Sequence, residues 1–217
     1  EILVLNQLSK NNHENIIKVF DIFQDTNNIY IIQDYWKEDL LTFVINSYNN
    51  TILSEDLVKN IIRQILFGVK HCHDNNIIHN DLKLENILYN NNNLRICLID
   101  FGISVISNVS NKSSNDDMGT IYYMSPERLK NSKNSSKSGD MWSIGIILYM
   151  LLYGVMPFKG SNDTEIINNI KSCNYTFDVN NSRNISENAK NLINDLLNKK
   201  INDRITVDDA LNYSFLI

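Results

Sequence analysis

The sequence predicts an α+β fold, in which one short helix and two strands precede a mostly helical remainder. Two apolar runs, at 16–23 and 29–35, are separated by the polar turn 25–28, which is typical of a β-hairpin. Residues 140–153 are apolar almost throughout, which predicts a buried helix. A third observation, a stripe of apolar residues at four-residue spacing, predicts one face of a long helix: Leu57, Ile61, Ile65 and Val69.

The remaining elements are predicted from capping residues and shorter apolar runs. Residues 1–9 predict a helix, because their apolar side chains fall on one side. Ser54 is expected to cap the long helix, which would end near Asp74. Short apolar runs predict small strands at 77–79, 87–89 and 94–99. Polar stretches predict loops at 90–93, 104–118 and 131–138. Two final helices are predicted at 186–198 and 206–213.

The composition limits the class of protein. A length of 217 residues suits a single domain. The net charge of −5 argues against a general nucleic-acid-binding surface. The longest apolar stretch, 144–152, is shorter than the ~18 residues that would indicate a membrane span. Three widely spaced cysteines predict free thiols in a reducing compartment, which indicates the cytoplasm or the nucleus.

The stretch that carries the chemistry is His79-Asn80-Asp81-Leu82-Lys83-Leu84-Glu85-Asn86. Asp100-Phe101-Gly102 follows an apolar run, and Gly119-Thr120 precedes Ser125-Pro126-Glu127. Each motif alone is weak, but this ordered set resembles the eukaryotic protein kinase family over the whole chain. The resemblance implies a two-lobe kinase-like fold with a truncated N-lobe. Residues 1–35 would supply the last part of helix C and two strands, and residues 36–217 the hinge and a mostly α-helical C-lobe.

The resemblance also implies Ser/Thr protein kinase activity with ATP and Mg²⁺. Asp81 would be the catalytic base that accepts the hydroxyl proton, and Lys83 would meet the transferred phosphate. Asn86 and Asp100 offer the hard oxygen ligands that suit Mg²⁺. Thr120 resembles the threonine that hydrogen-bonds the catalytic Asp and Lys in Ser/Thr kinases.

An ATP site between the lobes is implied as well. Glu1 aligns with the helix-C glutamate, whose lysine partner and glycine-rich loop would precede residue 1. The 217 residues alone are therefore expected to be weakly active or inactive. Leu88 would pack beneath adenine, and Asp39 would reach the ribose. Tyr35 and Trp36 could equally be packing aromatics, which is the favoured interpretation for Trp36. The gatekeeper and hinge positions fall on Gln33, Asp34, Tyr35 and Trp36.

Other residues resemble the kinase scaffold rather than its reacting groups. Asp140 would hold the backbone of the catalytic loop, and Glu127 with Arg204 would form a buried ion pair. His79 resembles a core histidine without a catalytic role. His71 and His73 have no acidic or cysteine cluster near them at metal-ligand spacing. Core packing or solvent exposure is therefore predicted for both.

Two features refine the resemblance. The stretches 119–127 and 189–213 look like those of the calcium/calmodulin-dependent and calcium-dependent kinases. That group implies protein substrates with a basic residue three before the target Ser/Thr, which Glu85 and Asp39 could pair with. Asn80 stands where the family has an arginine that neutralises an activation-loop phosphate, so such phosphorylation is not expected to be the main switch.

Two alternatives stay open. A pseudokinase or scaffold would bind partners without phosphoryl transfer; Asn80 and Gln33 favour it, whereas the intact Asp81, Lys83, Asn86 and Asp100 argue against it. An unrelated Asn-rich interaction domain would give no reason for the ordered motifs.

Overall fold

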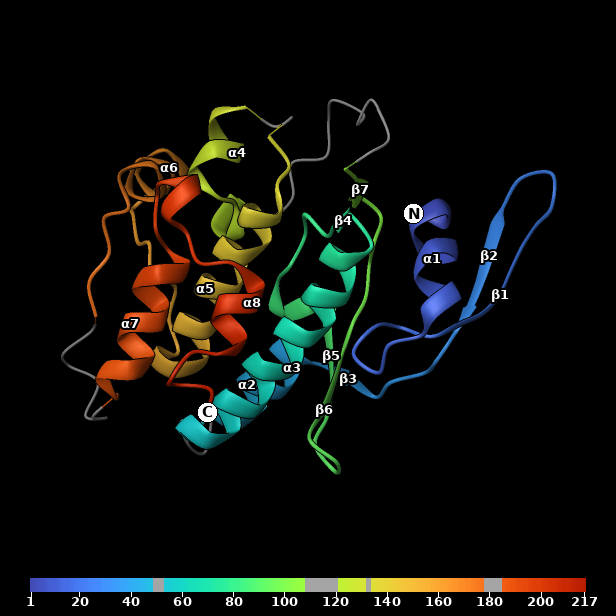
Figure 1. Cartoon of the computed structure of the whole chain (residues 1–217), viewed down its shortest axis with the longest axis horizontal. Helices are drawn as coiled ribbons and strands as arrows, with labels where there is room; N and C mark the ends of the chain where they lie inside the picture. Colours follow the sequence, from blue (N-terminus) through green and yellow to red (C-terminus); the bar gives the residue numbers. More distant parts are fainter. Residues whose placement is uncertain (49–52, 108–120, 132–133, 178–184) are drawn as a thin grey trace.

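The order of helices and strands separates a small N-terminal part from a larger helical part (Figure 1). The structure is a computed structural model that describes residues 1–48, 53–107, 121–131, 134–177 and 185–217. The α-helices are α1 (Ile2–Leu8), α2 (Leu40–Tyr48), α3 (Glu55–Asp74), α4 (Pro126–Lys130), α5 (Lys137–Tyr153), α6 (Asp163–Ser172), α7 (Glu187–Leu196) and α8 (Val207–Leu211). The strands are β1 (Val19–Gln24), β2 (Ile29–Gln33), β3 (Glu38–Asp39), β4 (Ile77–Ile78), β5 (Ile87–Asn90), β6 (Arg95–Leu98) and β7 (Val105–Ile106).

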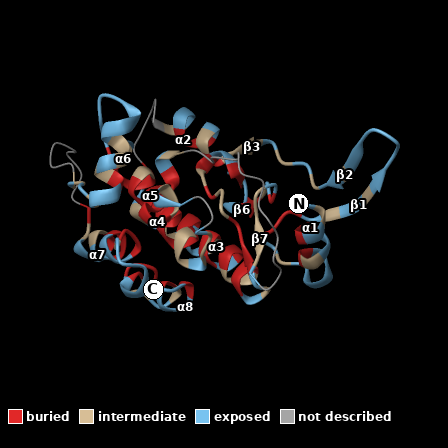
Figure 2. Cartoon of the chain, turned by 90° about the horizontal axis from the view of Figure 1, so that it is seen from above, coloured by how far each residue is buried: buried red, intermediate tan, exposed pale blue. Residues whose placement is uncertain are grey.

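The N-terminal part consists of α1 and the antiparallel hairpin β1–β2. The turn at 25–28 forms as predicted, since the Asp25 carboxylate accepts hydrogen bonds from the backbone N–H groups of Asn27 and Asn28 at 2.8 and 2.7 Å. This hairpin projects from the edge of the molecule, and most of its residues are exposed (Figure 2). Two backbone hydrogen bonds join the segment before β1 to β6, from Ile17 N–H to Leu98 O and from Leu98 N–H to Asn15 O.

The core of the larger part lies between α3, α5 and α7. The predicted stripe on α3 is buried apart from Leu57, which is half-buried, and the Ser54 side chain caps the helix by accepting from Leu57 N–H. Nearly every residue of α5 is buried, as its apolar sequence predicts (Figure 2). Gly145 lets α5 approach α7 closely, because a Cβ there would lie 2.8 Å from a Leu197 methyl carbon. None of the helices in the described ranges is long and apolar enough to cross a membrane.

Small strands position the segments that carry the motifs. The three-stranded sheet has the order β3-β5-β6, and β4 pairs with β7. Residues 79–86 therefore run between β4 and β5, and Asp100 follows the end of β6. Because β5 and β6 are adjacent antiparallel strands, the start of β5 and the end of β6 lie side by side.

Several element assignments differ from the sequence-based expectations. No helix was predicted for 40–48 or 163–172, where α2 and α6 form. The expected loop at 104–118 contains β7, and the rest of it, from 108 on, lies outside the described residues. The expected loop at 131–138 ends earlier, since α5 begins at Lys137. The Ser136 hydroxyl accepts from Gly139 N–H and so caps α5 one turn before the apolar run starts.

Candidate active site

Three predicted catalytic residues form one hydrogen-bonded cluster. Lys83 Nζ lies 2.8 Å from Asp81 Oδ2, and Asn86 Nδ2 donates to the same oxygen at 2.9 Å and to the Asp81 backbone oxygen at 2.9 Å. The Asp81 and Lys83 side chains are 13% and 19% exposed. The Asp81 carboxylate is thus oriented by two side-chain donors, and its side chain keeps a small exposed area.

Asp100 joins this cluster through the backbone. Ile99 N–H donates to Asn86 O at 3.0 Å, which places the residue before Asp100 against Asn86. Asp100 has a positive φ of 61°, and its carboxylate accepts from Gly102 N–H at 3.2 Å. Its side chain is exposed. We call Asp81, Lys83, Asn86 and Asp100 the catalytic face.

The free oxygens of the catalytic face fit a magnesium ion. Asn86 uses its amide nitrogen toward Asp81, and within the described ranges no hydrogen bond engages its Oδ1. Asp100 keeps one carboxylate oxygen without a hydrogen bond in the same ranges. No cluster of three or more His, Cys, Asp or Glu side chains occurs in the described part of the chain. Mg²⁺ suits such a sparse set of oxygen donors, because it keeps several waters and binds one or two protein oxygens together with phosphates.

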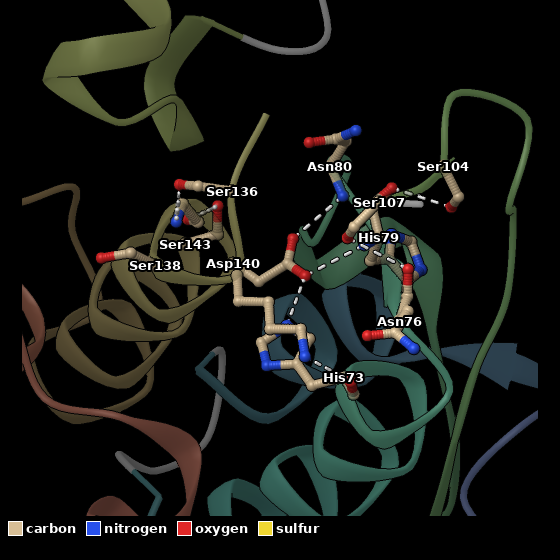
Figure 3. A network of polar contacts seen from close by, with 12 residues as sticks. His73, Asn76, His79, Asn80, Ser104, Ser107, Ser136, Ser138, Asp140 and Ser143 are labelled. Atoms are coloured by element: carbon tan, nitrogen blue, oxygen red, sulfur yellow. Dashed lines mark hydrogen bonds and ion pairs between the residues drawn. The ribbon is translucent and has the colours of Figure 1, made fainter. Parts of the chain in front are cut away.

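Asp140 on α5 holds the backbone of the catalytic loop, as predicted. Its Oδ2 accepts from His79 N–H and its Oδ1 from Asn80 N–H, each at 2.9 Å (Figure 3). His73 Nε2 lies 2.9 Å from Oδ2. Burial alone would raise the pKa of Asp140, but the hydrogen bond and charge of His73 lower it below its usual value. Asp140 is therefore an ionised acceptor that fixes two consecutive peptide groups just before Asp81.

The predicted ion pair between Glu127 and Arg204 is confirmed. Its two hydrogen bonds, from Nη1 to Oε1 and from Nη2 to Oε2, measure 2.8 and 3.1 Å, and the side chains are 8% and 0% exposed. Burial would raise the pKa of Glu127, yet the bonds to Arg204 hold it below its usual value. The Arg204 guanidinium also lies 5.0 Å from the Trp142 ring. We call His73, Asp140, Glu127 and Arg204 the anchor.

His79 is fully buried, in agreement with its predicted structural role. Its Nε2 lies 3.1 Å from Ile99 O, and its Nδ1 accepts from Asp81 N–H at 3.3 Å. Burial lowers the pKa of His79, although the negative charges of Asp140, Asp81 and Asp100 oppose this. The ring is therefore neutral at neutral pH, and it bridges the catalytic loop to the segment that leads to Asp100.

Several residues predicted to contact ATP lie in the N-terminal part. Among the described residues, no contact joins them to the catalytic face. Glu1 is exposed at the start of α1, Gln33 is exposed at the end of β2, and Tyr35 is 89% exposed. Asp34 N–H donates to Lys18 O at 3.0 Å. Trp36 packs against the core, which supports its interpretation as a packing residue.

Two further residues predicted to contact ATP, Asp39 and Leu88, lie on the three-stranded sheet. Asp39 is paired with Leu88 between β3 and β5. Both carboxylate oxygens of Asp39 engage Thr42, one with its N–H at 2.8 Å and one with its hydroxyl at 2.9 Å, in the manner of a helix cap for α2. Thr120 lies outside the described residues.

Sequence reasoning missed three residues around the catalytic loop. His73 was expected to be a core or surface residue, but it contacts Asp140. Ser104 Oγ donates to His79 O at 2.9 Å, so this serine is part of the support of the loop (Figure 3). Arg128, on α4, donates through Nη1 to Asn80 O. All three contacts join residues at least 25 positions apart, so no local pattern in the sequence indicated them.

Comparisons with known proteins agree with this geometry. A family model described as "Protein kinase domain" matches residues 1–216. The chain is 38% identical over 208 residues to calcium-dependent protein kinase 4 of Plasmodium falciparum, covering 94% of this chain and 38% of that protein. It is also 38% identical over 219 residues to human myosin light chain kinase family member 4, covering 100% of this chain and 54% of that protein. The chain thus spans well under two thirds of the length of these relatives.

A solved structure is similar in fold as well. The twitchin kinase region from C. elegans superposes with a TM-score of 0.89 at 31% sequence identity. The match covers 100% of this chain and 39% of that one. This likeness confirms the predicted fold class, and the named relatives confirm the predicted resemblance to calcium-dependent and related Ser/Thr kinases.

Proposed function

The chain belongs to the protein kinase domain family, and on that premise we propose that it transfers the γ-phosphoryl group of ATP to serine and threonine hydroxyls of protein substrates. The observation that carries the proposal is the cluster in which Lys83 and Asn86 both contact one oxygen of Asp81, at 2.8 and 2.9 Å. Phosphoryl transfer needs a positioned hydroxyl and neutralised phosphate charge, and this cluster offers both a base and a cation.

Asp81 is the proposed catalytic base. The substrate hydroxyl oxygen would attack the γ-phosphorus, the bond from that phosphorus to the β-bridging oxygen would break, and ADP would leave with the electron pair. The hydroxyl proton would pass to Asp81. Lys83 would first hold the Asp81 carboxylate in place and then face the transferring phosphoryl group, whose negative charge it offsets. Thr120 is proposed to hydrogen-bond these two residues.

Asn86 and Asp100 are the proposed Mg²⁺ ligands. When bound there, Mg²⁺ would neutralise charge on the ATP phosphates. Asn86 contributes Oδ1 because its Nδ2 is already committed to Asp81, so one side chain orients the base and offers a ligand oxygen. Asp100 is held by its bond from Gly102 N–H, which leaves an exposed carboxylate oxygen available.

The ATP-binding assignments are proposals as well. We retain residues 1–35 as a partial N-lobe and 36–217 as hinge and C-lobe. Glu1 and Leu88 keep their proposed contacts to the lysine partner and to adenine. Asp39 keeps its proposed contact to ribose, although it would have to exchange bonds with Thr42. The backbone of the hinge would bind adenine beside the gatekeeper: Gln33, Asp34, Tyr35 and Trp36.

The kinase domain implies protein substrates, and their sequence preference is a proposal. A basic residue upstream of the target Ser/Thr would pair with the exposed Glu85, as in the calcium-dependent group that the chain resembles. We also propose action in the cytoplasm or the nucleus, without nucleic acid as a partner and without a membrane span.

A phosphate-transfer assay tests the proposal. The protein at its full natural length is incubated with Mg²⁺ and γ-labelled ATP, and with Ser/Thr peptides that carry Arg or Ala three positions before the target. We expect transfer by the wild type, a preference for the Arg peptide, and a loss of at least about 100-fold in Asp81→Asn, which is typical when a general base is removed. Equal incorporation by wild type and variant would contradict the role of Asp81. ATP binding without any transfer would instead favour the pseudokinase alternative.

A further inference from the structure

The peptide group between Asn80 and Asp81 has an unusual set of supports. Asn80 adopts a positive φ of 67°, a region in which Asn is several-fold enriched over other non-glycine residues. Its N–H donates to Asp140 Oδ1 at 2.9 Å, and its side-chain Nδ2 donates to Ile103 O at 3.1 Å. Its carbonyl oxygen accepts from Arg128 Nη1. Both backbone polar groups of the residue before Asp81 and its side-chain Nδ2 are thus engaged.

The same peptide plane is held at both of its ends. Its carbonyl belongs to Asn80 and is bound by Arg128, and its N–H belongs to Asp81 and donates to His79 Nδ1 at 3.3 Å. Displacement of this plane would shift the Asp81 Cα, from which the side chain extends, because the plane ends at that atom. The guanidinium of Arg128 therefore acts on the orientation of Asp81 through the backbone.

Arg128 extends from a helix that is tied to the core. It lies on α4 directly after Glu127, whose ion pair with Arg204 is buried. Burial lowers the pKa of Arg128, and the negative charges of Asp140 and then Asp81 raise it. Since arginine is always charged in proteins, the half-buried guanidinium remains a cation. A fixed cation thus faces both the carboxylate that holds the loop and the carboxylate proposed to react.

The described residues leave little space in the cavity beside Arg128. The cavity shared by Asn80, Asp81, Arg128 and Asp140 leaves only about 10 Å³ open to the centre of a water molecule. A volume of this size holds about one water. The contact of Arg128 with the loop is therefore its role at this position, rather than the binding of a phosphate or another anion in the cavity.

We propose that Arg128 is a positioning residue, which orients Asp81 for phosphoryl transfer by holding the carbonyl of the Asn80–Asp81 peptide group. This inference rests on the proposed role of Asp81. It differs from a purely structural role, because the bond fixes one peptide plane beside the reacting carboxylate. Without the guanidinium, the half-buried carbonyl loses its donor and the plane is free to tilt. A displacement of about 1 Å at a reacting group can cost 10²-fold in rate.

Three variants of the full natural-length protein test the proposal. Arg128→Met removes the donor and keeps the apolar stem, Arg128→Lys keeps a cation, and Lys130→Met removes an exposed cation from the same helix as the matched control. We expect kcat to fall about 10- to 100-fold in Arg128→Met, with the KM for ATP unchanged within about twofold, since misorientation affects the chemical step. Arg128→Lys should recover part of this loss, and Lys130→Met should match the wild type.

Hydrogen exchange provides a readout that does not depend on activity. The amides of Asn80 and Asp81 should exchange at least about 10-fold faster in Arg128→Met, whereas those of α3 and α5 should not change, because only local opening is affected. Unchanged kcat with unchanged exchange would overturn the proposal. The proposal would also be overturned if Arg128→Met and Arg128→Lys lost equal activity, in proportion to their loss of folded protein. A wild type without transfer activity would contradict the proposed function alone, and the exchange comparison would still decide whether Arg128 holds this peptide.

Discussion

The catalytic face and the anchor place the same kinds of side chain in opposite surroundings. On the catalytic face, Asp81 is 13% exposed and Asp100 is exposed, and their partners leave oxygens free. In the anchor, Asp140 is 1% exposed and accepts three hydrogen bonds. The difference indicates a division of labour: the anchor fixes where the catalytic loop lies, and the face retains unsatisfied groups that can bind and react.

This comparison predicts different costs of substitution. A buried pair that loses one member leaves an uncompensated charge, so the anchor should respond mainly in stability. The exposed Asp100 can be neutralised at little cost in folding, and Asp81→Asn keeps an acceptor oxygen for Lys83 and Asn86, so the face should respond mainly in rate. The experiments below separate the two responses, from the largest expected effect to the smallest.

The largest stability effect is expected from the anchor pair of Glu127 and Arg204. Arg204→Met should lower the free energy of unfolding by about 3–5 kcal/mol, because it leaves the Glu127 carboxylate buried without its partner. Denaturant unfolding measures this. Lys200→Met is the control, since the Lys200–Asp203 pair is 74% and 55% exposed and should contribute at most about 1 kcal/mol. Similar losses in both variants would erase the distinction between anchor and surface.

Removal of the proposed metal ligand should leave stability intact and reduce rate. Asp100→Asn should slow phosphoryl transfer at least about 100-fold, because charge neutralisation by a bound metal is worth several kcal/mol. Chelation of Mg²⁺ with EDTA should abolish transfer by the wild type. A titration of rate against Mg²⁺ concentration provides the check. If Asp100→Asn has the wild-type rate at every Mg²⁺ concentration, Asp100 is not a ligand.

The buried neutral ring of His79 predicts a pH dependence of stability. Its folded pKa is lowered below the ordinary 6.5, so between the two values the unfolded chain binds a proton that the folded chain does not. The free energy of unfolding should therefore fall as pH drops below 6.5 and stop falling below the folded pKa. Denaturant unfolding at several pH values measures the slope. His79→Gln should flatten it, whereas an unchanged slope would show that other groups cause it.

The smallest effect is expected from a helix cap distant from both regions. Ser54→Ala should lower the free energy of unfolding by about 1 kcal/mol, since the hydroxyl that accepts from Leu57 N–H is lost. The rate per folded molecule should not change. Ser54→Asn keeps a capping side chain and should stay close to the wild type. A larger fall in rate than in folded fraction would mean that α3 couples to the catalytic face.

Local sequence signals predicted the parts of the fold that depend on local physics. Ser54 was predicted as a cap, and the apolar stripe of α3 and the amphipathic pattern at 186–198 predicted helices with buried faces. Helix α6 also carried a local signal that was overlooked, because Asn162 accepts from Glu165 N–H in a capping arrangement. In contrast, β7 has only two residues and forms through its pairing with β4, so no local pattern could predict it.

The candidate site shows the same difference between local and long-range contacts. Asp81, Lys83 and Asn86 lie within six residues of one another, and their cluster was predicted through the kinase resemblance. The contacts of His73 and Arg128 join positions 67 and 48 residues apart. Such contacts depend on how α3, α4 and α5 pack, and spacing along the chain does not contain that information.

The most direct test of the division between face and anchor measures rate and stability on the same samples of Asp81→Asn. The rate per folded molecule should fall at least about 100-fold, as is typical for the loss of a general base, while the free energy of unfolding changes by less than about 1 kcal/mol. A variant that keeps the wild-type rate, or one that loses activity only in proportion to its loss of folded protein, would contradict the account.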